Sequence, residues 1–216
     1  MKSFLVIGTG KFGHFICRRL AELGHEVMIA DSNEDNMSDL LDCTVSARIG
    51  DCTRRDVLET FGVEDFDECL VCMGENFQNS LQITDLLKEL GARYVIAVAS
   101  TEIQAKFLLR NGADRVVFPD RDMANRLAVS ISNDNIFDNF ELSDEYSMFE
   151  ISTPTEWLGK TVVEADVRKK YGLTILGRKK PNGRLTLDIH AGYVFNKDDH
   201  LMVVGSMETI AKVTND

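Results

Sequence analysis

Hydrophobic residues in roughly the first 135 positions follow two alternating patterns. Short apolar runs rich in β-branched residues predict strands at Ser3–Ile7, Glu26–Ala30, Thr44–Ile49, Glu68–Met73, Tyr94–Ala99 and Arg115–Phe118. Segments with helical spacing lie between them and predict helices at Lys11–Leu23, Glu34–Leu41, Arg54–Phe61, Asn76–Leu90 and Glu102–Arg110. Strands that alternate with helices form a parallel sheet covered on both faces. The pattern therefore predicts a doubly wound, Rossmann-like α/β domain.

Glycine and threonine residues mark the ends of these predicted helices. A glycine follows most of the helical segments, at Gly24, Gly62, Gly91 and Gly112, where a helix end favours a left-handed residue. Thr53 and Thr101 precede two of the helices, and we expect both to act as N-caps.

The pattern changes after Pro119. A further helix is predicted over Asp120–Ser132, and polar, turn-forming residues then interrupt the pattern through about residue 145. The remainder predicts strand Met148–Ser152, helix Val162–Tyr171, strands Leu173–Arg178, Leu185–Ile189 and His200–Val204, a hairpin turn at Pro181-Asn182-Gly183, and a short helix after Met207. We expect a Rossmann-like domain over residues 1–135, with a crossover helix over about 120–133, and a small α+β domain over residues 141–216.

The net charge of −11 narrows the choice of partners. It disfavours nonspecific binding to nucleic acid and direct adhesion to anionic lipid, and it leaves a protein partner open. The apolar runs are far shorter than the roughly 20 residues of a spanning helix, and the N-terminus enters a strand without a signal-peptide pattern. We expect a cytosolic protein with no direct membrane insertion.

The five cysteines are scattered among apolar neighbours, which suits a reducing compartment. Cys69 and Cys72 lie within one apolar run and are expected to be core residues. No second cysteine pair or histidine cluster accompanies them, so the sequence does not predict a zinc site.

The loop Gly8-Thr9-Gly10-Lys11-Phe12-Gly13 carries the clearest candidate chemistry. It follows a predicted strand and opens a predicted helix, and Asp31 ends the next strand 18 residues after Gly13. In this context the glycines allow a tight turn, close approach of a phosphate and helix packing, while the acid accepts hydrogen bonds from ribose hydroxyls. An acid there also repels a 2′-phosphate, which disfavours an NADP-type ligand. We predict nucleotide binding; Lys11 either faces a phosphate or is simply a solvated helix residue.

Three further turns follow predicted strands and form the expected rim of an adenosine pocket, because ligands of doubly wound sheets lie across the carboxyl ends of the strands. They are Asp51-Cys52-Thr53, Met73-Gly74-Glu75 and Val98-Ala99-Ser100.

Catalytic residues are not evident. The four histidines form no recognisable constellation, and a dehydrogenase needs an acid–base group beside its cofactor. Tyr193 and Lys197 have the spacing used by short-chain dehydrogenases, but that chemistry requires a helix. Here the stretch follows Gly192 and reads as a turn between strands. We therefore predict a protein that is not an enzyme.

The whole chain resembles the cytosolic regulatory subunits of Trk/Ktr-type potassium uptake systems, with an RCK N-terminal domain and a small RCK C-terminal domain. The resemblance rests on linked motifs: Val6–Gly13 and Gly24–Val27 with Asp31, Gly112–Pro119 with Asp122-Met123, Leu142–Tyr146, Tyr171–Ile175 and Asp199–Gly205. The last three distinguish the chain from plain dehydrogenases.

The resemblance implies a set of ligand contacts: Gly8, Thr9, Gly10, Lys11, Phe12, Gly13, Asp31, Asp51, Cys52, Met73, Gly74, Glu75, Val98, Ala99, Ser100 and, near the phosphate end or a divalent cation, Asp120. Ktr-type members usually have arginine in place of Lys11; an arginine side chain binds phosphate as a bidentate fork, whereas a lysine acts as a point charge. They also tend to have glutamate in place of Asp120, whose side chain is shorter. Arg168 lies in the helix that binds cyclic di-AMP in some members, or it is an ordinary exposed cation.

By resemblance, the chain is a nucleotide-sensing subunit that binds ATP/ADP, or NAD(H) as in the Trk branch. The same resemblance implies homodimers assembled into an octameric ring beneath a membrane potassium-translocating subunit, so that the chain is peripheral to the membrane. The apolar stripe Met123, Leu127 and Ile131 either forms a dimer contact or packs on its own domain. The alternative function is a small NAD(H)-dependent oxidoreductase.

Overall fold

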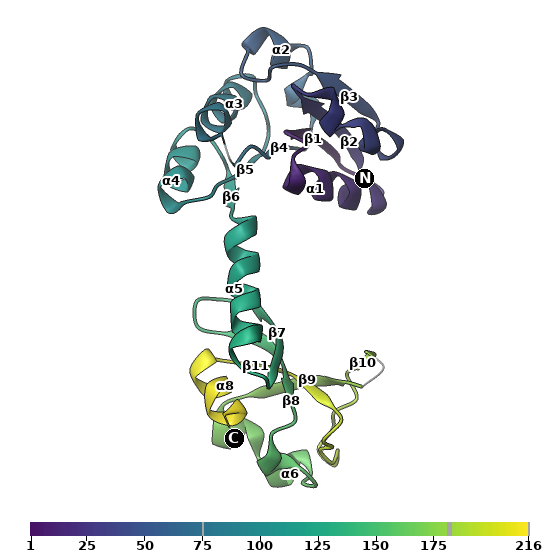
Figure 1. Cartoon of the computed structure of the whole chain (residues 1–216), viewed down its shortest axis with the longest axis vertical. Helices are drawn as coiled ribbons and strands as arrows, with labels where there is room; N and C mark the ends of the chain where they lie inside the picture. Colours follow the sequence, from purple (N-terminus) through teal and green to yellow (C-terminus); the bar gives the residue numbers. More distant parts are fainter. Residues whose placement is uncertain (75, 181–182, 216) are drawn as a thin grey trace. The chain divides into compact units, whose positions relative to one another are not determined.

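The computed structural model describes residues 1–74, 76–180 and 183–215. Internal contacts divide the chain into two compact units, Met1–Arg121 and Asp122–Asp216 (Figure 1). Helix α5 (Pro119–Ser132) carries the chain from the first unit into the second.

The first unit is built on a parallel sheet of six strands. The strands are β1 (Ser3–Ile7), β2 (Glu26–Asp31), β3 (Ser46–Ile49), β4 (Glu68–Val71), β5 (Val95–Val98) and β6 (Arg115–Val117), in the order β3-β2-β1-β4-β5-β6. The chain first winds outward from β1 to β3 and then returns beside β1 to wind through β4, β5 and β6. This order places a topological switch point between β1 and β4 and confirms the predicted doubly wound fold.

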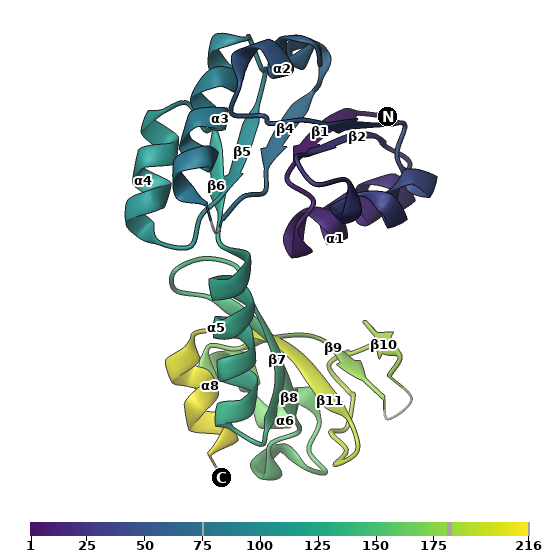
Figure 2. The same cartoon turned by 45° about the horizontal axis from the view of Figure 1, so that its top comes forward.

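Helices cover both faces of this sheet (Figures 1 and 2). They are α1 (Lys11–Glu22), α2 (Arg55–Glu59), α3 (Phe77–Glu89) and α4 (Glu102–Arg110), with short 3₁₀ helices η1 (Glu34–Asn36), η2 (Ser38–Cys43) and η3 (Val63–Asp65). Along β1, Leu5 and Ile7 join the core under α3 and α4, whereas Phe4 and Val6 join the core under α1 and η2. Burial on both faces explains why β1 is a continuous apolar run.

Most of the predicted helix ends agree with the structure. Gly24, Gly62, Gly91 and Gly112 all have positive φ, at 81°, 65°, 85° and 105°, and the Thr101 side chain accepts a hydrogen bond from the N–H of Gln104 at the start of α4.

Two local predictions are wrong. Thr53 is not an N-cap: its hydroxyl donates to Asp51, and Arg54 occupies the N-cap of α2. The helix predicted over Glu34–Leu41 is instead the pair of 3₁₀ helices η1 and η2, because Asn33 caps a first short turn and Met37 ends it.

The second unit contains an antiparallel sheet of five strands. The strands are β7 (Ile136–Glu141), β8 (Ser147–Ser152), β9 (Thr174–Lys179), β10 (Leu185–Thr186) and β11 (His200–Gly205), in the order β10-β9-β11-β8-β7, with helices η4 (Thr155–Trp157), α6 (Val162–Ala165), α7 (Val167–Tyr171) and α8 (Met207–Thr214). Strand β7 lies in the segment expected to be irregular. The helix expected over Val162–Tyr171 is divided at Asp166, whose φ is 48°.

The predicted hairpin turn falls between β9 and β10. Pro181 and Asn182 of that turn lie outside the described residues, while Leu185 pairs with Lys179 in antiparallel register on either side of it. Within the described parts of the chain, no helix has both the length and the apolar character needed to cross a bilayer.

Candidate functional site

The glycine loop joins β1 to α1 at the switch point of the sheet. Gly8 has φ +88°, and its N–H donates to the carbonyl of Ala30 at 2.8 Å. A Cβ on Gly13 would collide with the carbonyl oxygen of Gly8, so the helix can approach the loop only because residue 13 is glycine. A Cβ on Gly10 would meet no atom within 4 Å. The space outside Gly10 is therefore open to a ligand.

The N-terminus of α1 supplies the local electrostatics of this loop. Gly10 is its N-cap and has no side chain to satisfy the first backbone N–H groups, and the first turn carries no acidic residue. These free donors and the positive end of the helix dipole favour an anion. Lys11 is exposed in the first turn, and Thr9 is buried beneath the loop.

Asp31 ends β2 beside the loop and is held by four hydrogen bonds. Its Oδ2 accepts from the N–H and the hydroxyl of Thr9 at 2.8 and 2.9 Å, and its Oδ1 accepts from the N–H of Asn33 at 2.9 Å and the amide of Asn36 at 3.3 Å. Partial burial raises the pKa of Asp31, but the bonds from Asn33, Thr9 and Asn36 outweigh it, and the pKa lies below its ordinary value. Asp31 is therefore a fixed carboxylate at neutral pH.

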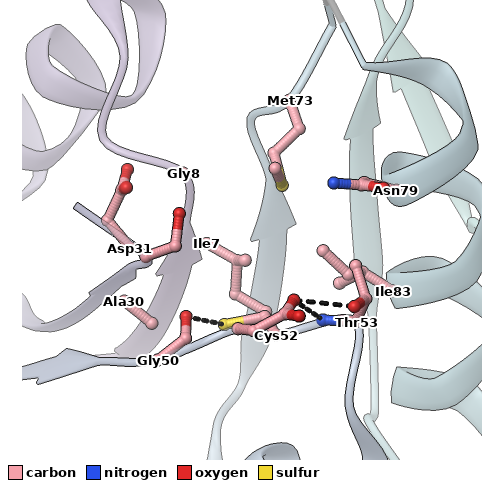
Figure 3. Close-up of a pocket in the computed structure, with 12 residues that line it drawn as sticks. Ile7, Gly8, Ala30, Asp31, Gly50, Cys52, Thr53, Met73, Asn79 and Ile83 are labelled. Atoms are coloured by element: carbon pink, nitrogen blue, oxygen red, sulfur yellow. Dashed lines mark hydrogen bonds between the residues drawn. The ribbon is translucent and has the colours of Figure 1, made fainter.

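A pocket opens between these elements and α3 (Figure 3). Its lining residues are Ile7, Gly8, Ala30, Asp31, Ser32, Gly50, Asp51, Cys52, Thr53, Met73, Asn79 and Ile83, around about 320 Å³ of space. Its lining is mostly apolar with a few placed polar groups, as is usual for small-molecule sites. Burial raises the pKa of the Cys52 thiol to about 12, so this side chain stays neutral and adds to the apolar wall.

The structure brings six of the residues predicted for the site into this pocket: Gly8, Asp31, Asp51, Cys52, Thr53 and Met73. Thr9 to Gly13 form the adjoining loop and helix start. Gly74, Val98, Ala99 and Ser100 gather at the ends of β4 and β5, where the Ser100 hydroxyl donates to the Gly74 carbonyl at 3.2 Å. Asp120 is exposed in the first turn of α5 and does not line the pocket. Glu75 lies outside the described residues.

Sequence reasoning missed six of the lining residues: Ile7, Ala30, Ser32, Gly50, Asn79 and Ile83. Ile7, Ala30 and Gly50 end strands or follow them directly, so their position at the carboxyl edge was a usable signal. Asn79 and Ile83 belong to α3, four residues apart on one helix face. Nothing in the helical pattern alone tells which face of α3 meets the pocket.

Comparison with known families accounts for both units. A family model of the TrkA-N domain matches residues 4–119, and one of the TrkA-C domain matches residues 146–216. The chain belongs to this TrkA family. The glycine loop, Asp31 and the pocket all lie in the TrkA-N domain.

Two relatives match this chain along nearly their whole length. Ktr system potassium uptake protein C of Bacillus subtilis (strain 168) is 39% identical over 211 residues, covering 98% of this chain and 95% of the relative. Ktr system potassium uptake protein A of the same organism is 34% identical over 215 residues, covering 100% of this chain and 96% of the relative.

Solved structures share the fold. The GsuK RCK domain matches with a TM-score of 0.67 at 19% identity, over 100% of this chain and 48% of that chain. The GsuK channel bound to NAD matches with a TM-score of 0.68 at 20% identity, over 98% of this chain and 38% of that chain. GsuK bound to ADP matches with a TM-score of 0.52 at 18% identity, over 60% of this chain and 34% of that chain. The chain thus spans about half or less of these solved chains.

The TrkA-C domain holds the tyrosine considered above as a catalytic candidate. Tyr193 is buried and donates its hydroxyl to Asp199. Burial, and then this hydrogen bond, raise the pKa of Tyr193, whereas an acid–base tyrosine needs a pKa near the working pH. Tyr193 is thus a packing residue of this domain. Arg168 is exposed on α7.

The prediction that Cys69 and Cys72 are core residues agrees with the structure. Cys69 is fully buried in the core of the first unit, and Cys72 packs against the core on the other face of the sheet. Burial raises the pKa of the Cys69 thiol to about 12, so it stays protonated and apolar.

Proposed function

We propose that this chain is the nucleotide-sensing regulatory subunit of a potassium uptake transporter. The observation that carries the proposal is the near-complete match to Ktr system potassium uptake proteins at 34–39% identity. The built nucleotide site adds to it, because the glycine loop, the open N-terminus of α1 and the fixed Asp31 lie around one pocket.

The proposed ligand is an adenine nucleotide that acts as an effector. Likeness to a channel bound to NAD and to the same channel bound to ADP supports an adenosine-containing ligand, with ATP/ADP and NAD(H) both open. Asp31 would accept from the ribose, and the backbone of Gly8 to Gly13 would hold the phosphates. Met73, Gly74, Glu75, Val98, Ala99 and Ser100 complete the proposed contacts.

Discrimination between effectors would occur at the phosphate end of the ligand. A ligand shifts a conformational equilibrium only through its different affinity for the two states. ATP and ADP share the adenosine and differ where Lys11 and Asp120 are proposed to act, and both side chains are exposed and available there. Lys11 would sense phosphate charge, and Asp120 would contact the phosphate end or a divalent cation.

Assembly is proposed to use the apolar stripe of α5. Met123, Leu127 and Ile131 are 60%, 56% and 74% exposed, so more than half of each side chain is left uncovered. A stripe of this kind at helical spacing suits a contact between two copies. We propose a homodimer at this helix, octameric rings of such dimers, and attachment to the membrane subunit at the cytoplasmic face.

The oxidoreductase alternative has weaker support. Full-length relatives are named as potassium uptake proteins, and the candidate tyrosine is committed to packing. Among the described residues, those that line the pocket include no histidine, tyrosine or lysine to serve as the acid–base group of a hydride transfer.

Calorimetry with ATP, ADP, NADH and NAD tests the proposal when each titration is paired with a turnover assay. We expect stoichiometric binding of at least one nucleotide and its recovery unchanged. Failure of every nucleotide to bind the folded, assembled chain would contradict the sensor role. Stoichiometric oxidation of NADH by a small substrate would favour the alternative enzyme.

A further inference from the structure

The wall of the pocket formed by α3 carries one polar side chain, Asn79. Figure 3 shows its amide extending from α3 toward the pocket, on the side opposite Asp31. Asn79 is half-buried. Its position across the pocket from the proposed ribose contact is where the base of a nucleotide would extend.

The other polar side chains of the pocket already have partners or face water. Asp31 accepts four hydrogen bonds, Asp51 accepts from the N–H and hydroxyl of Thr53 at 3.0 and 2.6 Å, and Ser32 is exposed. The Asn79 amide makes no hydrogen bond within the described residues, although its backbone N–H donates to Asn76. A half-buried amide whose donor and acceptor are both unused within the described residues is available to a ligand.

The surroundings of Asn79 are apolar and held in place. Ile83, one turn further along α3, is 1% exposed and lies with Ile7 in the core beneath the pocket. Gln82, also one turn from Asn79, donates to the carbonyl of Thr53 at 2.9 Å and so ties α3 to the turn after β3. This combination of apolar side chains with a single amide suits a planar heterocycle with a polar edge.

We propose that Asn79 contacts the base of the bound nucleotide, with its Oδ1 accepting from the 6-amino group of adenine and its Nδ2 donating to a ring nitrogen. An amide offers the donor and acceptor pair that adenine needs, as in asparagine–adenine pairs of DNA-binding proteins. The assignment rests on the proposed function and adds to it the residue that reads the base.

A four-way titration of the full chain tests this assignment. Wild type and Asn79→Ala are each titrated with ATP and with purine riboside triphosphate, which lacks the 6-amino group. We expect the wild type to bind ATP about tenfold more tightly than the analogue, and Asn79→Ala to lose this preference together with about tenfold of its ATP affinity. Gln78→Ala, an exposed neighbour on the same helix, is the matched control and should bind as wild type.

The isosteric Asn79→Asp keeps the shape of the side chain, replaces its donor with a charge and should also weaken ATP binding. An unchanged preference for ATP over the analogue in Asn79→Ala would overturn the role of Asn79 while leaving nucleotide sensing intact. Failure of the wild type to bind any of ATP, ADP, NADH and NAD would overturn the proposed function and this assignment with it.

Discussion

At the residue scale, Asp31 is fully occupied before any ligand arrives. Two hydrogen bonds reach each of its carboxylate oxygens, so the usual capacity of the group is filled. Ribose binding must therefore displace or share a donor. The amide of Asn36, at 3.3 Å the longest of the four contacts, is the one most easily given up.

The lowered pKa of Asp31 predicts how stability depends on pH. Its pKa in the folded chain lies below its unfolded value of about 3.9, so the unfolded chain binds the proton more readily. The stabilisation from the carboxylate is present above about pH 4 and is lost as the pH falls through the lowered pKa.

Urea unfolding of wild type and Asp31→Asn measures this effect. We expect Asp31→Asn to be the less stable protein at neutral pH and the gap to close in acid. A gap that is constant across the whole range would show that the charge of Asp31 does not contribute.

Alanine substitutions at two glycines of the loop should have different effects, one on stability and the other on nucleotide binding. Gly13→Ala should destabilise the fold by at least about 2 kcal/mol, because its Cβ meets the Gly8 carbonyl. Gly10→Ala should leave stability unchanged, because its Cβ meets open space, but should weaken nucleotide binding. Thermal unfolding and calorimetry on both variants separate the two effects. Equal destabilisation by both would contradict the geometry of the loop.

Some residues of the site could be predicted from the sequence and others could not. Gly8 and Gly13 belong to one strand–helix turn and Asp31 ends the next strand, so their spacing alone predicted that the three lie close together. Asn79 and Ile83 reach the pocket only through the packing of α3 on the sheet. That packing is a tertiary effect which a helical period does not encode.

At the element scale, strand β7 is the clearest departure from the sequence pattern. Its Asp138 and Asn139 are turn formers, and they led to a prediction of irregular chain. In the structure Arg126 of α5 donates to both carboxylate oxygens of Asp138, at 2.6 and 2.5 Å, and Ile136 is buried. Pairing with β8, together with the ion pair to Arg126, accommodates this polar segment in a strand.

If the ion pair between Arg126 and Asp138 stabilises the second unit, removing the Asp138 carboxylate should lower the free energy of unfolding. Asp138→Ala should destabilise the second unit by about 1–2 kcal/mol. This figure is lower than for a buried bidentate ion pair, because both side chains are partly exposed and solvent screens their charges. Asp134→Ala, an exposed neighbour, is the control and should change stability little. Urea unfolding followed by circular dichroism measures both. Equal stability of the two variants would refute a structural role for the pair.

A charge placed in the apolar stripe of α5 should weaken self-association without unfolding the chain. Leu127→Asp places a charge on an exposed apolar face and should weaken self-association by at least about tenfold while leaving the monomer folded. Asn125→Asp adds the same charge to another exposed position of α5 as the control. Sedimentation velocity reports the change. Wild-type association by Leu127→Asp would exclude the stripe as the dimer contact.

At the scale of the whole molecule, each unit has its own core and its own sheet. The glycine loop, Asp31 and the pocket lie in the TrkA-N domain. Under the proposed function, a nucleotide bound there would affect the membrane partner only by favouring one arrangement of the assembly over another. The pattern of the sequence predicted both folds, but the arrangement of an assembly lies beyond what one chain's pattern encodes.

Rubidium flux through vesicles that hold a Ktr-type membrane subunit tests the central claim most directly. With the wild-type chain added, the account predicts flux that differs between two of the four nucleotides ATP, ADP, NADH and NAD. With Asp31→Asn, checked to be folded and assembled, that difference should disappear. Flux that is indifferent to the chain, or that responds to nucleotide equally with Asp31→Asn, would contradict the claim that the site is a sensor.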